Sequence, residues 1–399
     1  MKKILNFGLL FLFLISLASC NGQTKNEQIP KRNNKNKIVG GGCDGCELMY
    51  IGMPKNIQPI DTSSAWNGKG QKLLVTGKIL KLDGVTPAPN VIVYYWQTDH
   101  NGYYANGEGK SQKHGRIRGW VKSDEQGNYS MYTIRPTPYP NRDIPAHIHL
   151  SIKEPEIDDE YYIHNLEFAD DILLTSKKRK ALKNRGGSGI LRVLIDKEIQ
   201  IAEHNIVLGL NIPNYPITID HTIKSGLEIG EDNPSFTPFH AWGPDKGTRT
   251  CPVCKYGRFH GIVYFVGSQP NWSEIKEWLT FLERESVNRE KYLKVYFVYG
   301  NKKGYSKSNR QIELEQLGKE LNLENIALTF VPSFTDIQSE VHLNKINPKV
   351  ENTIIIYRHR NIIGKFVNLK PTKGNQNEVS KMLDKTVSKY LELPEPKHN

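Results

Sequence analysis

The chain has 399 residues, enough for two ordinary domains that each bury a hydrophobic core. Lysine and arginine outnumber aspartate and glutamate by 54 to 42, which gives a formal net charge of +12. Beyond the first twenty residues no apolar run is long enough to cross a bilayer, so the composition excludes a protein built from several membrane-spanning helices. We interpret the positive charge as a solvated basic surface without a catalytic role.

The N-terminus has the features of an export signal. Lys2 and Lys3 precede an apolar run from residue 4 to 17, and the segment Leu17-Ala-Ser-Cys20 follows. The small residues before Cys20 resemble a bacterial lipobox, in which the cysteine is acylated and becomes the first mature residue. The alternative is an ordinary secretory signal with a chance cysteine. We therefore expect a signal peptide over residues 1–19 and a lipid anchor at Cys20.

This interpretation sets the localisation. The segment 20–37 is rich in Asn, Lys and Gln and predicts a disordered tether. We expect a bacterial cell-envelope protein, periplasmic or on the outer membrane, that contacts the membrane through its lipid. An exported protein does not routinely meet nucleic acid, so we expect no nucleic-acid partner.

The other four cysteines form two C-x2-C pairs, Cys43 with Cys46 and Cys251 with Cys254. An exported protein reaches a compartment that permits disulfides. We favour two local pairs, redox-active or structural, over disulfides that join the domains. A zinc site shared by the two pairs is the third alternative, because they lie far apart in the sequence.

Residues 38–210 have the pattern of a β-rich domain. The runs 73–80 and 91–96 are rich in β-branched and aromatic residues, and Gly-containing turns separate them. This pattern predicts an antiparallel β-sandwich. Scattered Pro and Gly over residues 211–247 predict a linker.

The spacing of apolar residues changes over residues 248–392, where strand-like and helix-like patterns alternate. Strands are expected at 261–266, 293–299 and 326–331, with a hairpin at 353–357 and 362–367. Ser273 is expected to cap a first helix. Leu314, Leu317 and Leu321 indicate a second helix, and the stripe from Val379 to Val387 indicates a third. The alternation predicts an α/β domain with a mainly parallel sheet and helices on its faces, followed by a tail over 393–399.

The order of these elements resembles the thioredoxin-like fold. The cysteines depart from that family, because Cys251 and Cys254 precede the first strand, whereas the reactive cysteine of thioredoxins follows it. Redox exchange by Cys251 and Cys254 and a structural bridge both stay open.

The motifs that bear most on chemistry lie in the β-rich domain. His147 and His149 are one residue apart in Pro145-Ala-His-Ile-His-Leu-Ser-Ile, so on a strand both point to one side. Upstream are Trp96-Gln-Thr-Asp-His-Asn-Gly-Tyr-Tyr104, Gly119-Trp-Val-Lys-Ser-Asp-Glu-Gln-Gly-Asn-Tyr129 and Thr133-Ile-Arg-Pro-Thr-Pro-Tyr-Pro140. In this order the series resembles the intradiol ring-cleavage dioxygenases, and the resemblance covers roughly residues 37–210.

The resemblance implies a non-haem Fe(III) enzyme of aromatic compound catabolism. Such an enzyme opens a catechol between its two hydroxyls with O2 and gives a muconate-type diacid. Carried over by position, the iron ligands are Tyr104, Tyr139, His147 and His149, and Tyr103 competes with Tyr104 for the first place. Phenolate suits Fe(III), and the bound cation lowers the tyrosine pKa from its usual value near ~10.

Two residues have implied catalytic roles beyond metal binding. Tyr139 would leave the metal and accept a substrate proton. Family members usually carry an arginine three residues before the first histidine, where this chain has Ile144. Arg142 lies two residues earlier and is the candidate to replace it.

Two other protein classes compete with this interpretation. His147, His149 and Glu154 match the H-x-H-x4-E pattern of cupins, with His204 as a later metal ligand. The turn pattern also suits prealbumin-like β-sandwiches that act as non-catalytic binding modules. Neither class requires the two tyrosines, although a degenerate dioxygenase that only binds iron or catecholates stays open.

Overall fold

The computed structural model describes residues 38–43, 45–104, 113–217 and 223–396. The predicted signal peptide, Cys20 and the predicted tether lie outside these residues and stay predictions. The described residues from 38 onward belong to one compact unit. No helix among the described residues has the length and apolar character needed to cross a membrane.

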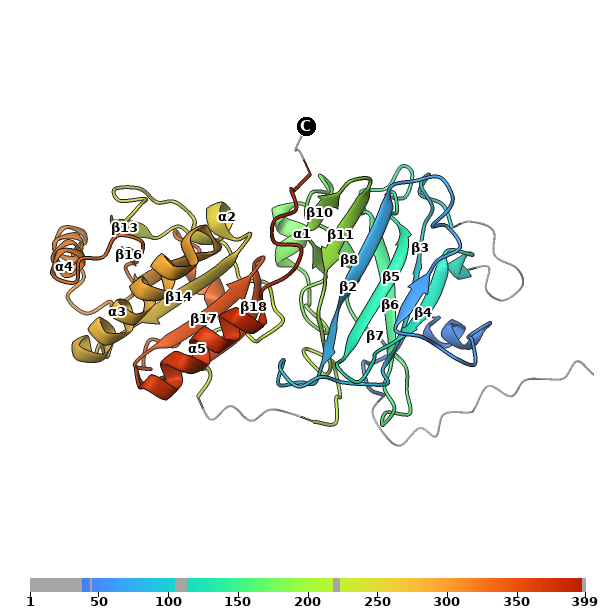
Figure 1. The fold of residues 1–399 in the computed structure, drawn as a ribbon, viewed down its shortest axis with the longest axis horizontal. Helices are drawn as coiled ribbons and strands as arrows, with labels where there is room; N and C mark the ends of the chain where they lie inside the picture. The colour runs from blue at the N-terminus through green and yellow to red at the C-terminus, as the bar shows by residue number, and fades with distance from the viewer. Residues whose placement is uncertain (1–37, 44, 105–112, 218–222, 397–399) are drawn as a thin grey trace, which may run out of the picture. The chain divides into compact units, whose positions relative to one another are not determined.

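The β-rich part consists of two six-stranded sheets, drawn in blue to green in Figure 1. The first sheet has the order β1-β5-β2-β11-β10, with β12 also paired to β2. Its strands are β1 Ile60–Thr62, β2 Lys72–Leu80, β5 Asn128–Ile134, β10 Val193–Asp196, β11 Ile199–Glu203 and β12 Ile206–Val207.

The second sheet has the order β4-β3-β6-β8-β9, with β7 also paired to β6. Its strands are β3 Ile92–Gln97, β4 Arg118–Lys122, β6 His147–Lys153, β7 Tyr161–Tyr162, β8 Leu166–Phe168 and β9 Ile190–Leu191. Two short helices accompany the sheets, η1 Cys46–Tyr50 and α1 Ser176–Lys180. The strands expected at 73–80 and 91–96 are confirmed by β2 and β3.

A single core fills the space between the two sheets. Leu73 and Val75 of the first sheet and Ile148 and Leu150 of the second are all fully buried in it. The predicted sandwich is therefore present, but it is not purely antiparallel. β1 pairs in parallel with β5, β2 with β11 and β12, and β8 with β9.

The remaining residues form an α/β region around a third six-stranded sheet, with the order β13-β16-β15-β14-β17-β18. Its strands are β13 Phe239–Trp242, β14 His260–Val266, β15 Leu293–Tyr299, β16 Ala327–Phe330, β17 Thr353–Arg358 and β18 Asn361–Val367. Its helices are α2 Pro252–Tyr256, α3 Trp272–Arg289, η3 Glu290–Tyr292, α4 Lys307–Glu320, η4 Val341–Asn344 and α5 Lys373–Lys385.

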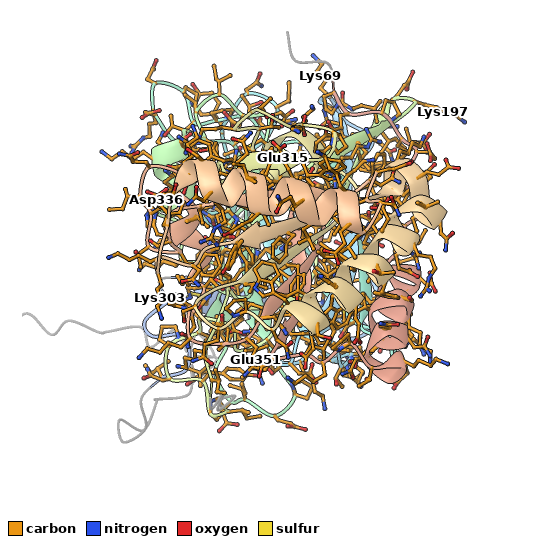
Figure 2. All side chains as sticks on the ribbon, turned by 90° about the vertical axis from the view of Figure 1, so that its left-hand side faces the viewer. Lys69, Lys197, Lys303, Glu315, Asp336 and Glu351 are labelled. Atoms are coloured by element: carbon orange, nitrogen blue, oxygen red, sulfur yellow. A yellow bond between two sulfur atoms is a disulfide. The ribbon has the colours of Figure 1, made fainter. Side chains whose placement is uncertain are left out.

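The expected mainly parallel sheet is mixed instead. Only β14, β15 and β16 run parallel, whereas β13, β17 and β18 each pair antiparallel. Because β14, β15 and β16 follow one another in one direction across the sheet, right-handed crossovers place α3 and α4 on the same face. α5 packs there too, through Val379 and Leu383. Figure 2 views the chain from the side of α4, which carries Glu315.

Three further expectations need correction. Asn271, not Ser273, caps α3, because its side chain accepts a hydrogen bond from the Glu274 N–H. Val387 lies beyond the end of α5 and is exposed, so it is not part of the apolar stripe. The range 211–247 is more than a connector, because its last part forms β13.

Candidate metal centre

The candidate centre is built on β6, where His147 and His149 lie on the face turned away from the sandwich core. Ile148 and Leu150 alternate with them and are buried in that core. Trp96 of β3 is the cross-strand neighbour of His149 and lies on the same outer face. The predicted one-sided pair of histidines is therefore present.

Two loops bring tyrosines to this face. Tyr104 lies shortly after the end of β3, and Tyr139 lies in the loop between β5 and β6. The hydroxyl of Thr98 donates to the carbonyl of Thr137 over 2.9 Å, and the hydroxyl of Thr137 donates to the carbonyl of His100 over 2.9 Å. These two hydrogen bonds hold the two tyrosine-bearing loops together.

Gly102 allows this close approach. Its φ is +82°, and a Cβ there would lie 2.1 Å from the carbonyl oxygen of Pro138. Both the backbone conformation and the lack of space exclude a side chain. A glycine is thus required between the Trp96 motif and Tyr104.

The four carried-over residues converge at their polar ends. The Tyr104 oxygen lies 2.7 Å from the Tyr139 oxygen and 2.9 Å from His149 Nε2. His147 Nε2 lies 3.3 Å from the Tyr139 oxygen and 3.1 Å from His149 Nε2. We call these four residues the Tyr2His2 cluster. Two phenolic oxygens and two imidazole nitrogens that face one another are a donor set that fits a hard cation.

Tyr104 rather than Tyr103 belongs to the Tyr2His2 cluster. The side chain of Tyr103 is 60% exposed, whereas Tyr104 is half-buried against Trp96 and its neighbours. The structure therefore separates the two candidates that the sequence left in competition.

Burial controls the charges of the Tyr2His2 cluster. It lowers the pKa of His147 below its usual value, and it lowers that of His149 to about 3, with a further contribution from His147. Both histidines are therefore neutral at physiological pH and can offer lone pairs. Burial and the neighbouring Tyr139 raise the pKa of Tyr104, so a phenolate at Tyr104 requires a nearby positive charge.

The ring nitrogens that point away from the Tyr2His2 cluster also have partners. Nδ1 of His147 lies 2.8 Å from the carbonyl oxygen of Pro145, and Nδ1 of His149 lies 3.2 Å from the hydroxyl of Tyr162. The Trp96 ring stacks on His149 with centroids 4.8 Å apart and an interplanar angle of 16°. These contacts fix the planes of both imidazoles.

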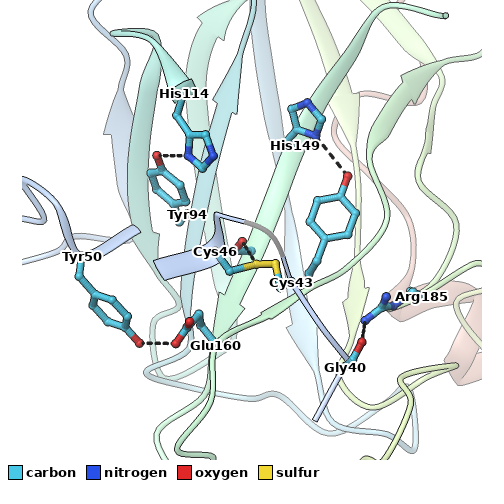
Figure 3. Close-up of a disulfide and its surroundings, with 11 residues drawn as sticks. Gly40, Cys43, Cys46, Tyr50, Tyr94, His114, His149, Glu160 and Arg185 are labelled. Carbon is cyan, nitrogen blue, oxygen red and sulfur yellow. Dashed lines mark hydrogen bonds between the residues drawn. A yellow bond between two sulfur atoms is a disulfide. The ribbon is translucent and has the colours of Figure 1, made fainter. Parts of the chain in front are cut away.

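A short N-terminal segment, residues 40–51 with residue 44 outside the described part, packs on the same outer face (Figure 3). We call it the cap. The Cys43–Cys46 disulfide lies within it, and the hydroxyl of Ser151 donates to Cys46 Sγ over 3.1 Å. Ser151 follows His149 by two residues, so the cap contacts the same strand face as the histidines.

Aromatic packing and hydrogen bonds tie the cap down. Met49 is fully buried against Tyr94 and Trp96, and the indole N–H of Trp120 donates to the Met49 carbonyl over 2.7 Å. At the start of the cap, Arg185 Nη2 donates to the Gly40 carbonyl over 2.7 Å. The cap therefore covers the aromatic residues that surround His149.

Arg142 lies on the exposed loop between Tyr139 and β6, as does Ile144, which is 38% exposed. The Arg142 backbone N–H donates to the Tyr139 carbonyl over 3.3 Å. Its side chain is exposed, so its predicted catalytic role stays a prediction.

The cupin arrangement is wrong. Glu154 accepts hydrogen bonds from Tyr161 and Tyr215, and His204 lies 2.8 Å from His164, so neither joins the histidines of β6. In the described part of the chain, no group of three or more His, Cys, Asp or Glu residues is placed to hold a metal ion. A metal on β6 would therefore need the phenolic oxygens.

Both C-x2-C pairs form local disulfides, Cys43–Cys46 and Cys251–Cys254. Local pairing was the favoured prediction, and it excludes disulfides between domains and a shared zinc ion in this state. Cys254 is exposed, and its Sγ lies 3.2 Å from the Ser235 hydroxyl. Redox exchange by Cys251 and Cys254 stays a prediction.

Sequence reasoning missed Tyr162 and the cap. Tyr162 belongs to no motif, and only the pairing of the two-residue strand β7 with β6 brings it to His149. The cap was treated only as the site of a cysteine pair. The available signal was Ser151, a small polar residue two positions after His149. On a strand it lies on the same face as the histidines, where another segment can pack.

Comparisons with known proteins concern the β-rich part. Residues 54–186 match the family model described as dioxygenase. A hydroxyquinol 1,2-dioxygenase of Rhizobium sp. is 33% identical over 82 residues, which are 21% of this chain and 28% of that protein. An intradiol ring-cleavage dioxygenase of Aspergillus niger is 28% identical over 108 residues, 23% of this chain and 33% of that protein. The matches thus span at most 33% of these relatives.

Solved structures give weaker likenesses. A hydroxyquinol 1,2-dioxygenase from Pseudomonas putida shares 24% identity with a TM-score of 0.31, covering 39% of this chain and 62% of that one. A dioxygenase domain from a Streptomyces species shares 19% identity with a TM-score of 0.31, covering 39% of this chain and 91% of that one. None of these matches supports the thioredoxin-like fold that the sequence predicts for residues 248–392.

The segment 54–186 contains the whole Tyr2His2 cluster, and for this β-rich part the comparisons support the intradiol ring-cleavage dioxygenase family.

Proposed function

We propose that this protein is a non-haem Fe(III) dioxygenase that cleaves a catechol-type ring between its two hydroxyls and incorporates both atoms of O2. The convergence of the Tyr104 and Tyr139 oxygens with Nε2 of His147 and His149 carries this proposal. Two phenolates and two neutral imidazoles would offset two of the three charges of Fe(III). When bound, the iron would supply Lewis-acid activation of the catechol.

The residues of the chain have separable roles in this proposal. Tyr104 packs against Met49, Tyr94 and Trp96. The two histidines lie on β6, which pairs with β3 and β8. These three residues would hold the metal throughout the reaction. Tyr139 lies in the loop between β5 and β6 and, unlike Tyr104, is not among the residues packed against Met49, Tyr94 and Trp96, so its hydroxyl oxygen can move more easily. We assign to Tyr139 Oη the acceptance of a proton from one substrate hydroxyl.

Trp96, Met49 and the cap exclude water from one side of His149, because Met49 is fully buried and Trp96 nearly so. A drier setting strengthens the attraction between phenolate and cation. This gives the buried aromatic residues a role in metal retention.

The second candidate function is a non-catalytic module that binds iron or a catecholate. One observation favours it: the loop that should carry a charge-stabilising arginine has Ile144, and Arg142 is exposed. Such a module would take up iron with the same residues but leave catechols intact.

The experiment uses the purified protein loaded with Fe(III). We expect stoichiometric iron, a visible tyrosinate-to-iron charge-transfer band, and consumption of O2 with catechol, protocatechuate or hydroxyquinol. Mass spectrometry with isotopically labelled O2 should find both labelled atoms in the ring-opened product.

The variants His147→Ala and His149→Ala should lose iron, band and turnover together. His100→Ala is the matched control, because His100 is exposed and only its backbone carbonyl joins the two loops. If the parent protein binds iron and shows the charge-transfer band but consumes no O2 with any of the catechols, the non-catalytic binding module is the better interpretation. A parent protein without iron affinity would refute both functions.

A further inference from the structure

The two histidines of the Tyr2His2 cluster are held by different kinds of partner. Nδ1 of His147 faces the carbonyl oxygen of Pro145, which can only accept a hydrogen bond. Neutral His147 must therefore carry its proton on Nδ1 and direct the lone pair of Nε2 to the cluster. The backbone alone sets this tautomer.

Nδ1 of His149 instead faces a side chain, the hydroxyl of Tyr162, at 3.2 Å. The side chain of Asn165 also lies near this ring, where its hydrogen bond opposes the lowering of the His149 pKa by burial. A phenol can donate or accept, so it tolerates both tautomers of His149. If Tyr162 donates, Nε2 of His149 carries the proton and cannot bind a metal. If Tyr162 accepts from Nδ1–H, Nε2 offers its lone pair.

The position of Tyr162 is set by strand pairing. β7 pairs antiparallel with β6, with Tyr162 opposite Ser151 and Tyr161 opposite Ile152. Tyr162 therefore lies on the outer face with the histidines, whereas Tyr161 points to the core and donates to Glu154. Two adjacent tyrosines thus have opposite surroundings, which makes Tyr161 a built-in control.

We propose that Tyr162 is a positioning residue that accepts the Nδ1–H of His149 and so presents Nε2 of His149 to a metal in the Tyr2His2 cluster. This inference rests on the proposed function, in that it assumes a metal at the cluster. Outer partners of metal-bound histidines typically contribute roughly 10–100-fold to metal affinity. Tyr162 would act only through His149 and would not touch the metal.

The test compares Tyr162→Phe with the parent, using Fe(III) supplied as a chelate and Ga(III) as its diamagnetic substitute. We expect Tyr162→Phe to bind Ga(III) roughly 10–100-fold more weakly. In the Ga(III)-loaded parent, nitrogen-resolved NMR should show a slowly exchanging, hydrogen-bonded Nδ1–H on His149. This signal should shift and exchange faster in Tyr162→Phe, while that of His147 stays unchanged.

Tyr161→Phe removes a hydroxyl from the neighbouring position and should lower stability without changing Ga(III) affinity or the His149 signal. Equal Ga(III) affinity in the parent and Tyr162→Phe would overturn the inference and leave the proposed function standing. An unchanged His149 Nδ1–H signal in Tyr162→Phe would overturn it equally. A parent that binds neither Fe(III) nor Ga(III) would refute the proposed function, and the inference with it.

Discussion

Removal of the Cys43–Cys46 disulfide should weaken the cap in two measurable ways. The bond closes a loop with a sequence separation of 3. Closing so short a loop removes roughly 6 cal/mol/K of entropy from the unfolded chain, or about 2 kcal/mol at 25 °C. The variant Cys43→Ser/Cys46→Ser also loses the contact of Ser151 with Cys46 Sγ. We therefore expect about 2 kcal/mol less unfolding free energy and faster loss of iron.

The assay is urea denaturation combined with iron release to a chelator in excess. The matched control is Cys251→Ser/Cys254→Ser, whose disulfide has the same sequence separation of 3 but lies in the α/β region. The control should lose about the same unfolding free energy, since the closed loops are equal in length. Its iron release should match that of the parent. Equal release rates in all three proteins would refute a link between the cap and the metal.

Four further predictions concern single residues. Tyr139→Phe should keep part of the iron but lose turnover; full turnover in steady-state assays would exclude Tyr139 as the proton acceptor. Arg142→Ala should slow turnover with iron retained if Arg142 replaces the arginine missing at Ile144, and unchanged kcat would leave it a surface residue. Burial lowers the pKa of His164 to about 4 from 6.5. The unfolded chain therefore binds more protons between these pH values, and unfolding free energy falls as the pH drops, by about 2–3 kcal/mol. His164→Gln should flatten this part of the pH profile in chemical denaturation, and an unchanged slope would contradict the assignment. Cys20→Ser should release the protein from membranes or block its processing, and unaltered membrane fractionation would contradict a lipid anchor at Cys20.

The sequence predicted two strands of the β-rich part, β2 and β3, because their residues report burial directly. Lys72–Leu80 and Ile92–Gln97 alternate or concentrate apolar side chains, and each belongs to the interior of a sheet. Their partners were not predictable, since register depends on contacts between distant segments. The parallel pairing of β2 with β11 is such a case.

In the α/β region, local capping chemistry explains one error. Both Asn271 and Ser273 are good N-cap residues, and either could begin the helix from propensity alone. The helix begins at Trp272, whose ring also contacts that of Tyr299 with centroids 5.3 Å apart. Propensity alone does not distinguish two locally equivalent starts, and the contact with distant Tyr299 is not visible in the sequence.

The four residues of the Tyr2His2 cluster were found from sequence because the order of their motifs resembles a known family, and that resemblance implied each position. His147 and His149 need only a strand to lie on one face, whereas Tyr104 also depends on the approach of its loop to Pro138, which Gly102 permits. Tyr162 has no such local requirement, since its relation to His149 depends on β7 folding back beside β6. A residue that orients a ligand can therefore lie on any neighbouring strand of the same face. Motifs disclose the donors themselves, whereas the hydrogen bonds that choose the tautomer of each donor follow from sheet register.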